Sequence, residues 1–267
     1  MKKADVKNIV VTGKSGAGKQ PRIDVLVNEF GFQQLSTGNI FREYLGKFRG
    51  SGFKGDSKAF YDGTKGAFKP DKDIIAALKK AGVKGDMAPI VLGLKADFFV
   101  SSGKFVPDAI TNELFTSYFS RMGFKKAVLD GYPRTVEQAD YLLKMAKEKG
   151  TSIGFVVIVD NDDDAIIKRT IGRRICPKCS KVYHLEHKPP KDGKFCKDCG
   201  AEVVQRSDDT EEKIRSRLRE FEEKCKPAIT VLEKAGIPVV KVPGNLPVFT
   251  DEAVRKSVMD AVAPIMK

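Results

Sequence analysis

A glycine-rich loop near the start of the chain constrains the fold more than any other sequence feature. The apolar, β-branched run Asn8–Thr12 ends at Gly13, residues 13–19 read GKSGAGK, and residues 23–30 have the apolar spacing of a helix. A strand, a G-x-x-x-x-G-K loop and a helix in this order indicate a phosphate-binding loop. Glycines let backbone N–H groups converge on phosphate oxygens, and Lys19 and the helix start add positive charge. The alternative is an ordinary glycine-rich turn between strand and helix.

The same alternation of strand and helix recurs along the chain. Further strands are expected at residues 127–129, 153–159 and 237–242, and helices at residues 135–149, 162–174, 210–235 and 250–265. Apolar strands between amphipathic helices predict an α/β fold, in which helices cover both faces of a parallel sheet. Two segments interrupt this three-layer core as insertions: residues 47–90, with a single helical pattern near residues 73–81, and residues 175–205.

The composition is that of a folded protein with an anionic partner. Of 267 residues, 41% are hydrophobic and 31% charged, and the net charge of +13 favours a nucleotide, a nucleic acid or an acidic membrane as partner. No apolar run approaches the roughly 20 residues of a membrane helix. The basic start, MKKADVKN, precedes only a short apolar run and does not fit a signal peptide. We therefore expect a cytoplasmic protein that is not embedded in a membrane.

Four of the five cysteines form two C-x-x-C pairs. Cys176 and Cys179 are separated by sixteen residues from Cys196 and Cys199, which is the spacing of a structural four-cysteine zinc site. Four thiolates leave no open position, so the metal is expected to hold a small subdomain together. The alternative is two disulfides in the same segment.

Arginines occur where a phosphoryl-transfer site needs them. Arg42 follows residues 35–38, which read LSTG, and Arg134 follows the strand expected at residues 127–129. Four others flank the cysteine segment: Arg169, Arg173, Arg206 and Arg217. Taken singly, each is explained by a solvated charge or a surface ion pair. Taken together, they suit an enzyme that positions and neutralises phosphates.

Six motifs in order resemble those of the adenylate kinase family, in the form with a zinc-bearing lid: GKSGAGK, LSTGNIFR, GKFVPD, LDGYPRTVEQAD, IGRRIC and QRSDDTEEKIRSRL. The resemblance covers residues 7–247. It implies reversible transfer of phosphate from ATP to AMP, giving two ADP, with Mg²⁺ as cofactor and a role in adenine nucleotide homeostasis. It also implies a monomer and the following parts: core residues 1–35, 108–171 and 210–267, a nucleoside-monophosphate domain at 36–107, and a lid at 172–209.

The resemblance also assigns residues to each substrate. For ATP it implies Gly16, Ala17, Gly18, Lys19, Gln20, Pro21, Arg169, Arg173, Val182, Tyr183 and Leu246. For AMP it implies Thr37, Arg42, Lys104, Phe105, Val106, Gly131, Tyr132, Pro133, Arg134, Gln138, Arg206 and Arg217, with Gln138 bonded to adenine. Catalysis would rest on Lys19, Arg134, Arg173, Arg206, Arg217 and on Asp130, which would orient Mg²⁺ through water. The alternative for Asp130 is a turn-forming aspartate before Gly131.

Two departures from the family pattern leave other functions open. Gln20 and Pro21 stand where the family has Gly and Thr, and a proline supplies no N–H and is expected to shift the helix start. Residues 47–90 are additional and carry ten Lys or Arg against five Asp, which suggests either a surface elaboration or a contact with an acidic partner. The rival functions are therefore a weakened relative that binds nucleotides or nucleic acid, and a kinase for another nucleoside monophosphate.

Overall fold

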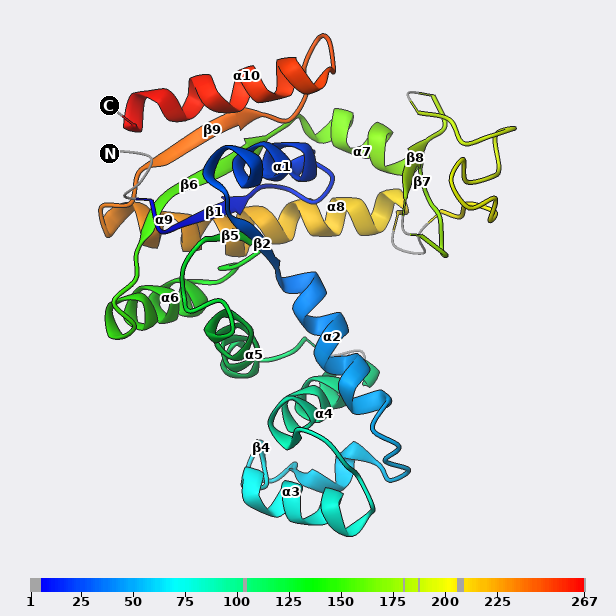
Figure 1. Ribbon diagram of the computed structural model, residues 1–267, viewed down its shortest axis with the longest axis vertical. Coiled ribbons are helices and arrows are strands. Elements are labelled where there is room, and N and C mark those ends of the chain that lie inside the picture. Colours follow the sequence, from blue (N-terminus) through cyan, green and yellow to red (C-terminus); the bar gives the residue numbers. More distant parts are fainter. Residues whose placement is uncertain (1–5, 103–104, 180, 187, 206–208, 267) are drawn as a thin grey trace.

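The computed structural model describes residues 6–102, 105–179, 181–186, 188–205 and 209–266. Figure 1 shows a central sheet between layers of helices, from which two bodies extend. One contains α2, α3 and α4 and lies at the bottom of the view, and the other contains β7 and β8 and lies at the right. Within the described ranges, every helix is too short or too polar to span a lipid bilayer.

The central sheet has five parallel strands in the order β2-β5-β1-β6-β9. Their bounds are β1 (Asn8–Thr12), β2 (Gln33–Ser36), β5 (Ala127–Asp130), β6 (Ile153–Asp160) and β9 (Val239–Pro243). The four strands expected from the sequence are confirmed, and β2 is an edge strand that the sequence analysis did not assign. Parallel pairing brings the carboxyl ends of β1 and β5 to the same edge of the sheet, where α/β proteins bind their ligands.

Alternate residues of each strand enter two separate apolar cores. Ile9 and Val11 pack in one core and Val10 packs in the other. One core includes residues of α1 (Lys19–Phe30) and α10 (Asp251–Val262); the other includes residues of α5 (Asp108–Ser120), α6 (Val136–Glu148) and α9 (Lys226–Lys234). Every residue of β1 is buried because both faces of the sheet are covered. The α/β fold with helices on both faces is confirmed.

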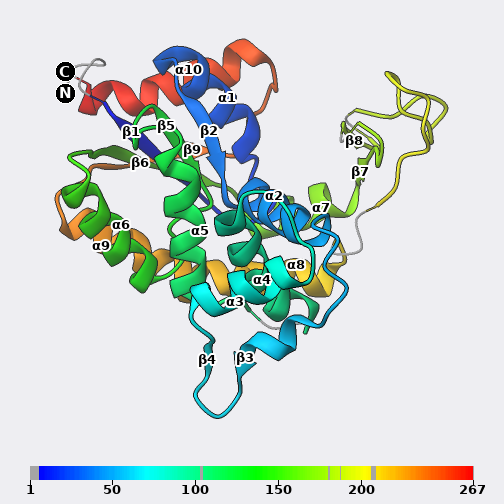
Figure 2. The ribbon, with the colours of Figure 1, turned by 60° about the horizontal axis from the view of Figure 1, so that its bottom comes forward.

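Residues 47–90 form a folded unit with an apolar core of its own. The long helices α2 (Thr37–Arg49) and α4 (Met87–Ser101) pack on each other, and the short elements η2 (Ser57–Phe60), β3 (Tyr61–Asp62), β4 (Ala67–Phe68) and α3 (Asp71–Lys80) connect them in the chain. The core includes Phe48, Phe60, Ile74 and Leu78. The expected helical pattern corresponds to α3, whereas two-residue strands are too short to show a sequence period. Figure 2 shows the β3–β4 hairpin at the edge of this unit.

The second body begins where α7 (Asp163–Ile171) ends. The antiparallel strands β7 (Arg173–Ile175) and β8 (Val182–His184) follow. Isolated β-bridges then pair Ile175 with Val204, His184 with Lys188, and Phe195 with both Lys191 and Glu202. The helix expected over residues 162–174 is therefore shorter, because Arg173 already pairs with His184 in the small sheet.

Two further helical expectations need correction. The helix expected over residues 210–235 consists of α8 (Glu211–Glu220), one π-helical turn η3 (Phe221–Cys225) and α9. Pro21 does not shift the start of α1, which begins at Lys19. Backbone N–H groups in the first turn of a helix have no intrahelical partner, so a proline there removes no helical hydrogen bond. The last helix is α10, extended by the short turn η4 (Ala263–Ile265).

Candidate active site

The phosphate-binding loop connects β1 to α1 at the carboxyl edge of the sheet. Gly13 has a φ of 142°, and a Cβ added there would lie 2.4 Å from the carbonyl oxygen of Val159. Gly18 precedes α1 with a φ of 97°. Both positions therefore need glycine, since an L side chain rarely adopts a positive φ. Gly16, Ala17 and Gly18 complete the curved loop, while Gln20 lies exposed on α1 and bonds to Asp24 and Gln34.

Lys19 folds back over this loop. Its Nζ donates hydrogen bonds to the carbonyl oxygens of Gly13 at 2.8 Å and Lys14 at 3.1 Å. Burial lowers the pKa of Lys19 to about 8, while the nearby Asp130 raises it and Arg134 lowers it. The parallel pairing of β1 and β5 places the start of this loop beside Asp130, the last residue of β5.

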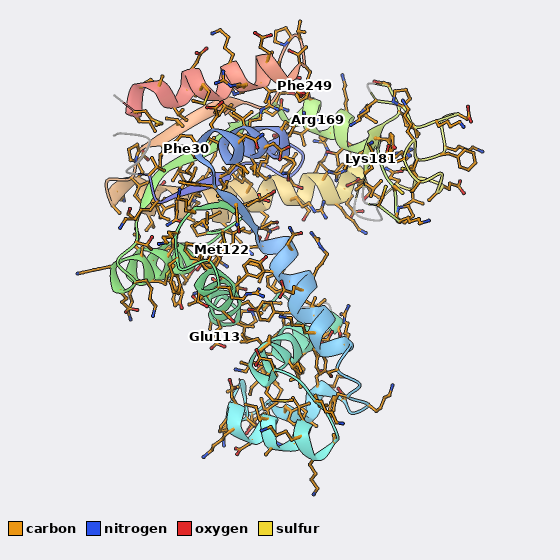
Figure 3. The ribbon with its side chains drawn as sticks, in the orientation of Figure 1. Phe30, Glu113, Met122, Arg169, Lys181 and Phe249 are labelled. Atoms are coloured by element: carbon orange, nitrogen blue, oxygen red, sulfur yellow. The ribbon has the colours of Figure 1, made fainter. Side chains whose placement is uncertain are left out.

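Two arginines connect the loop to the segment after β9. Arg169 on α7 donates to the carbonyl oxygens of Gly16 and Gly244, the latter at 3.3 Å. Arg22 on α1 donates to the carbonyl oxygens of Gly18 at 3.3 Å and Pro243 at 2.7 Å. The Arg22 guanidinium also lies 5.3 Å from the ring centroid of Phe249, which is 55% exposed. Figure 3 labels Arg169 and Phe249 at this end of the sheet.

The sequence analysis did not select Arg22, although it is fully buried. Burial lowers the pKa of Arg22 to about 10, and the charge of Arg169 adds to the shift. Its Nε has no hydrogen-bond partner in the described structure. The sequence did contain a signal for Arg22: it stands at a position of an amphipathic helix that is expected to face the core, where an apolar residue is usual. Leu246, half-buried, lies in the loop that follows the carbonyl groups bound by the two arginines.

The end of β5 carries the second group of candidate residues. Asp130 accepts a hydrogen bond from Gln34 Nε2 at 2.9 Å through Oδ2. The hydroxyl of Thr37, the first residue of α2, donates to the carbonyl of Gly131 at 3.2 Å, and Arg134 Nε donates to the same carbonyl at 2.9 Å. The backbone of Gly131 therefore brings the LSTG and LDGYPR motifs together.

Tyr132 and Pro133 are buried behind this backbone. The Tyr132 hydroxyl donates to Asn112 Oδ1 at 2.6 Å, and its ring stacks on Phe115 at a centroid distance of 3.8 Å. Burial raises the pKa of Tyr132 above its usual value. Its side chain therefore supports the loop from the core. Arg42 on α2 is exposed and bonds to Asn39 one turn away.

A cavity of about 730 Å³ lies beside these residues. It is lined by parts of α2, the loop before α5, the start of α6 and η3, including Thr37, Phe105, Val106, Gly131, Arg134 and Gln138. Phe105 is 79% exposed, and its ring lies 4.8 Å from Lys224 Nζ. The cavity therefore collects residues from three of the sequence motifs. Lys104 lies outside the described residues.

The residues of the expected lid and of its flanks are placed unequally. Arg173 makes a two-pronged ion pair with the fully buried Asp209, with Nη2–Oδ1 and Nε–Oδ2 distances of 2.5 and 2.9 Å. Val182 is 47% exposed. The buried Tyr183 hydroxyl contacts Cys196 Sγ at 3.2 Å, so a nucleotide contact at Tyr183 would come from its backbone. Arg217 lies half-buried on α8, and Arg206 lies outside the described residues.

The four paired cysteines form a cluster that could hold a metal ion. Their Sγ atoms all lie within 4.8 Å of one another, and the closest pairs are Cys176–Cys199 at 3.4 Å and Cys179–Cys196 at 3.5 Å. A tetrahedral zinc ion with Zn–S bonds of about 2.3 Å separates its sulfur ligands by about 3.8 Å. All four thiols are free, so the alternative of two disulfides is wrong in this structure.

Lys14 is a further residue of the loop that the sequence analysis did not single out. Its Nζ pairs with Asp163 at 2.5 Å and Glu222 at 3.3 Å, which joins the loop to α7 and η3. Burial opposes the shift, but the hydrogen bonds and charges of the two carboxylates outweigh it and raise the pKa of Lys14. Its partners are distant in sequence, so no local pattern could identify it.

Comparison with known proteins identifies the family. The family model described as adenylate kinase matches residues 87–237 of this chain. The adenylate kinase of Caldanaerobacter subterraneus subsp. tengcongensis is 33% identical over 238 residues, 89% of each chain. The adenylate kinase of Symbiobacterium thermophilum is 33% identical over 256 residues, 94% of this chain and 99% of the relative. That of Bacillus cytotoxicus is 33% identical over 230 residues, 86% of this chain and 88% of the relative.

The fold and the site are those of a nucleoside monophosphate kinase, a phosphotransferase with a phosphate-binding loop. The chain belongs to the adenylate kinase family. The resemblance found in the six sequence motifs is therefore confirmed.

Proposed function

We propose that this protein catalyses the reversible, Mg²⁺-dependent reaction of ATP with AMP to give two ADP. One observation carries the proposal: β1 and β5 pair in parallel, with Val11 opposite Asp130, so the phosphate-binding loop and the loop of Gly131 and Arg134, which lines the 730 Å³ cavity, start at the same edge of the sheet. A nucleotide on the loop and a nucleotide in the cavity would therefore bring their phosphates together. A protein that binds a single nucleotide has no need of this second site.

The ATP phosphates would occupy the loop from Gly16 to Lys19, and Gln20 would add a backbone N–H. Pro21 cannot, because it has no N–H. Arg169 would leave its carbonyl partners to lie over the adenine, next to the backbone of Leu246. On the lid, Arg173, Val182 and Tyr183 would complete the ATP contacts. Residues 172–209 would form this lid, and residues 36–107 the domain that closes on the monophosphate.

AMP would occupy the cavity. Its phosphate would meet Arg42, Arg134, Arg206 and Arg217, and its adenine would meet Gln138. The remaining contacts would come from Thr37, from the segment of Lys104, Phe105 and Val106, and from the backbone of the GYP sequence, Gly131, Tyr132 and Pro133. Tyr132 and Pro133 are buried, so their part is to hold the backbone in place.

The transfer requires positioning and neutralisation of charge. An oxygen of the AMP phosphate forms a bond to the γ-phosphorus of ATP while the bond from that phosphorus to the bridging oxygen of ADP breaks. The attacking oxygen is already ionised near neutral pH, since the second pKa of such a phosphate is about 6. Lys19 and the arginines would offset the repulsion between the two polyanions, and closure of the lid would exclude water.

Two metals suit the residues present. Mg²⁺ prefers oxygen ligands and usually keeps several waters, and the Asp130 carboxylate at the edge of the sheet would hold it through water. Bound there, Mg²⁺ would neutralise charge on the phosphates. Zn²⁺ would occupy the cluster of Cys176, Cys179, Cys196 and Cys199 and hold the lid together. Cysteine pairs that bind a metal are typical of a reducing compartment, which supports the expected cytoplasmic location.

The proposal is tested by ADP formation from ATP and Mg²⁺ with AMP, GMP, CMP or UMP, for the unaltered protein and for a Pro21→Thr variant. Turnover of AMP alone is the expected result, and the variant is expected to bind ATP more tightly. Absence of turnover in the unaltered protein, with recovery in the variant, would instead favour the nucleotide- or nucleic-acid-binding relative. Turnover of another monophosphate would favour the other kinase. A monomer is expected, to be checked by light scattering.

The basic insertion supports a second, separate proposal. Lys79 and Lys80 end α3, and Lys84 follows; all three are exposed and make no ion pair with another described residue. The helix α3 lies at the end of the unit formed by residues 47–90 that is away from the central sheet (Figure 1). We propose that this group of lysines contacts an acidic partner.

A further inference from the structure

The amide of Gln138 is held at both ends within the wall of the cavity. The side chain is 5% exposed. Its Oε1 accepts a hydrogen bond from the backbone N–H of Arg134 at 2.8 Å, and its Nε2 donates to Asp108 Oδ1 at 2.6 Å. The other carboxylate oxygen of Asp108 accepts from Thr135 Oγ1 at 2.7 Å, and Thr135 Oγ1 accepts in turn from Gln138 N at 3.2 Å. The four residues thus form one closed network.

These two partners permit only one orientation of the amide. A backbone N–H donates and does not accept, whereas a carboxylate accepts and does not donate. If the amide were turned over, Nε2 would face the N–H of Arg134 and Oε1 would face the carboxylate of Asp108. Both contacts would be repulsive. Asp108 is also the first residue of α5, where the helix dipole favours a negative charge.

The oriented amide retains one donor and one acceptor for a ligand. An amide carries two N–H groups and two lone pairs on oxygen, and the network uses one of each. A 6-aminopurine presents an acceptor at N1 beside an amino donor at C6, which complements this pair. A 6-oxopurine presents an N–H donor at N1 beside a carbonyl acceptor at C6, which opposes it.

We propose that Asp108 is a positioning residue that, through Gln138, makes this cavity select a 6-aminopurine monophosphate over a 6-oxopurine monophosphate. The inference rests on the proposed function, because it assigns the purine to the cavity. Asp108 and Gln138 both line the cavity, together with Arg134 and Thr135 of the same network. The selectivity belongs to the network and not to Gln138 alone, since a free amide could turn over to suit either base.

The test compares AMP with inosine 5′-monophosphate (IMP), which differs from AMP only in this edge of the base. The unaltered protein is expected to prefer AMP in kcat/KM by about 10³-fold or more, because a 6-oxopurine leaves buried polar groups unpaired. In Asp108→Ala the ratio is expected to fall about tenfold or more, since only the Arg134 N–H then orients the amide. Asp108→Asn keeps the shape of the side chain and one oxygen that can accept from Gln138 Nε2, so this variant is expected to give an intermediate AMP-to-IMP ratio.

A matched control and a double-mutant cycle separate selectivity from folding. Asp71 is the first residue of α3 and, like Asp108, follows a proline, so Asp71→Ala removes the same charge from an equivalent helix start. Its AMP-to-IMP ratio is expected to stay unchanged. If Asp108 acts through the amide, then Asp108→Ala has no further effect on the ratio once Gln138→Ala is present.

Each outcome decides between the claims. If Asp108→Ala lowers kcat/KM for AMP and for IMP by the same factor, then Asp108 only stabilises the start of α5 and the inference is wrong. If the unaltered protein does not phosphorylate AMP, the proposed function fails first, independently of any variant. The affinities of AMP and IMP, measured by calorimetry on the same proteins, then still report whether Asp108 sets the ratio.

Discussion

Lys19 makes ATP binding dependent on pH in a range where lysines do not usually titrate. Burial lowers its pKa to about 8, from a usual value of about 10.4. In the absence of nucleotide its ammonium group has only two carbonyl oxygens as hydrogen-bond partners in the described structure. ATP phosphates would supply the missing negative charge and stabilise the protonated form.

The size of the effect follows from the protonated fraction of Lys19. If only the protonated form binds ATP, the affinity is half its maximum at pH 8 and about one-eleventh at pH 9. Between pH 7 and pH 9 the affinity should therefore fall about tenfold, or about 1.4 kcal/mol. The same shift acts on stability: charged Lys19 lowers the free energy of unfolding below pH 8, and this penalty is relieved as the pH rises from 8 towards its usual pKa.

The assay is calorimetry of ATP and Mg²⁺ binding at pH 7, 8 and 9, in two buffers of different ionisation enthalpy. Proton uptake on binding is expected above pH 8. Lys19→Arg keeps a charge that does not titrate in this range, and its affinity should not change between pH 7 and 9. A midpoint above pH 10 in the unaltered protein, or the same pH dependence in Lys19→Arg, would refute the reasoning.

Three further predictions concern residues that lie away from the reacting phosphates. Arg22→Leu removes the bridge from α1 to the carbonyl of Pro243 and should raise KM for ATP about tenfold without changing KM for AMP; an equal change in both would indicate general loss of structure. Cys196→Ser should weaken zinc binding at least about 100-fold, measured by metal analysis after dialysis, and make the lid sensitive to protease; a protein that retains one zinc per chain would contradict the four-cysteine site. Charge reversal of Lys79, Lys80 and Lys84 to Glu should lower the salt concentration that elutes the protein from heparin by more than the matched triple change at the end of α6, at Lys144, Lys147 and the C-cap Lys149; equal elution of the two variants would contradict the proposed surface.

Local patterns in the sequence were sufficient for the core and for the phosphate-binding loop. The run Asn8–Thr12 is apolar because both faces of the central sheet are covered, and its end at Gly13 could be read directly. The cysteine pairs were equally informative, because metal ligands follow short spacings. By contrast, the sequence misjudged Pro21, since the effect of a proline depends on where in the first turn it falls.

The sequence by itself determined the fold class, the family and the residues that each motif carries, because these depend on local periods and spacings. Only the tertiary structure decided which residues act together. Arg22 meets the carbonyl of Pro243, and Asp108 meets Gln138, across separations that no local pattern encodes. The folded unit of residues 47–90 showed only one helical pattern in the sequence, because the rest of its core comes from apolar side chains of α2, η2 and α4 that meet only after the chain has turned back on itself.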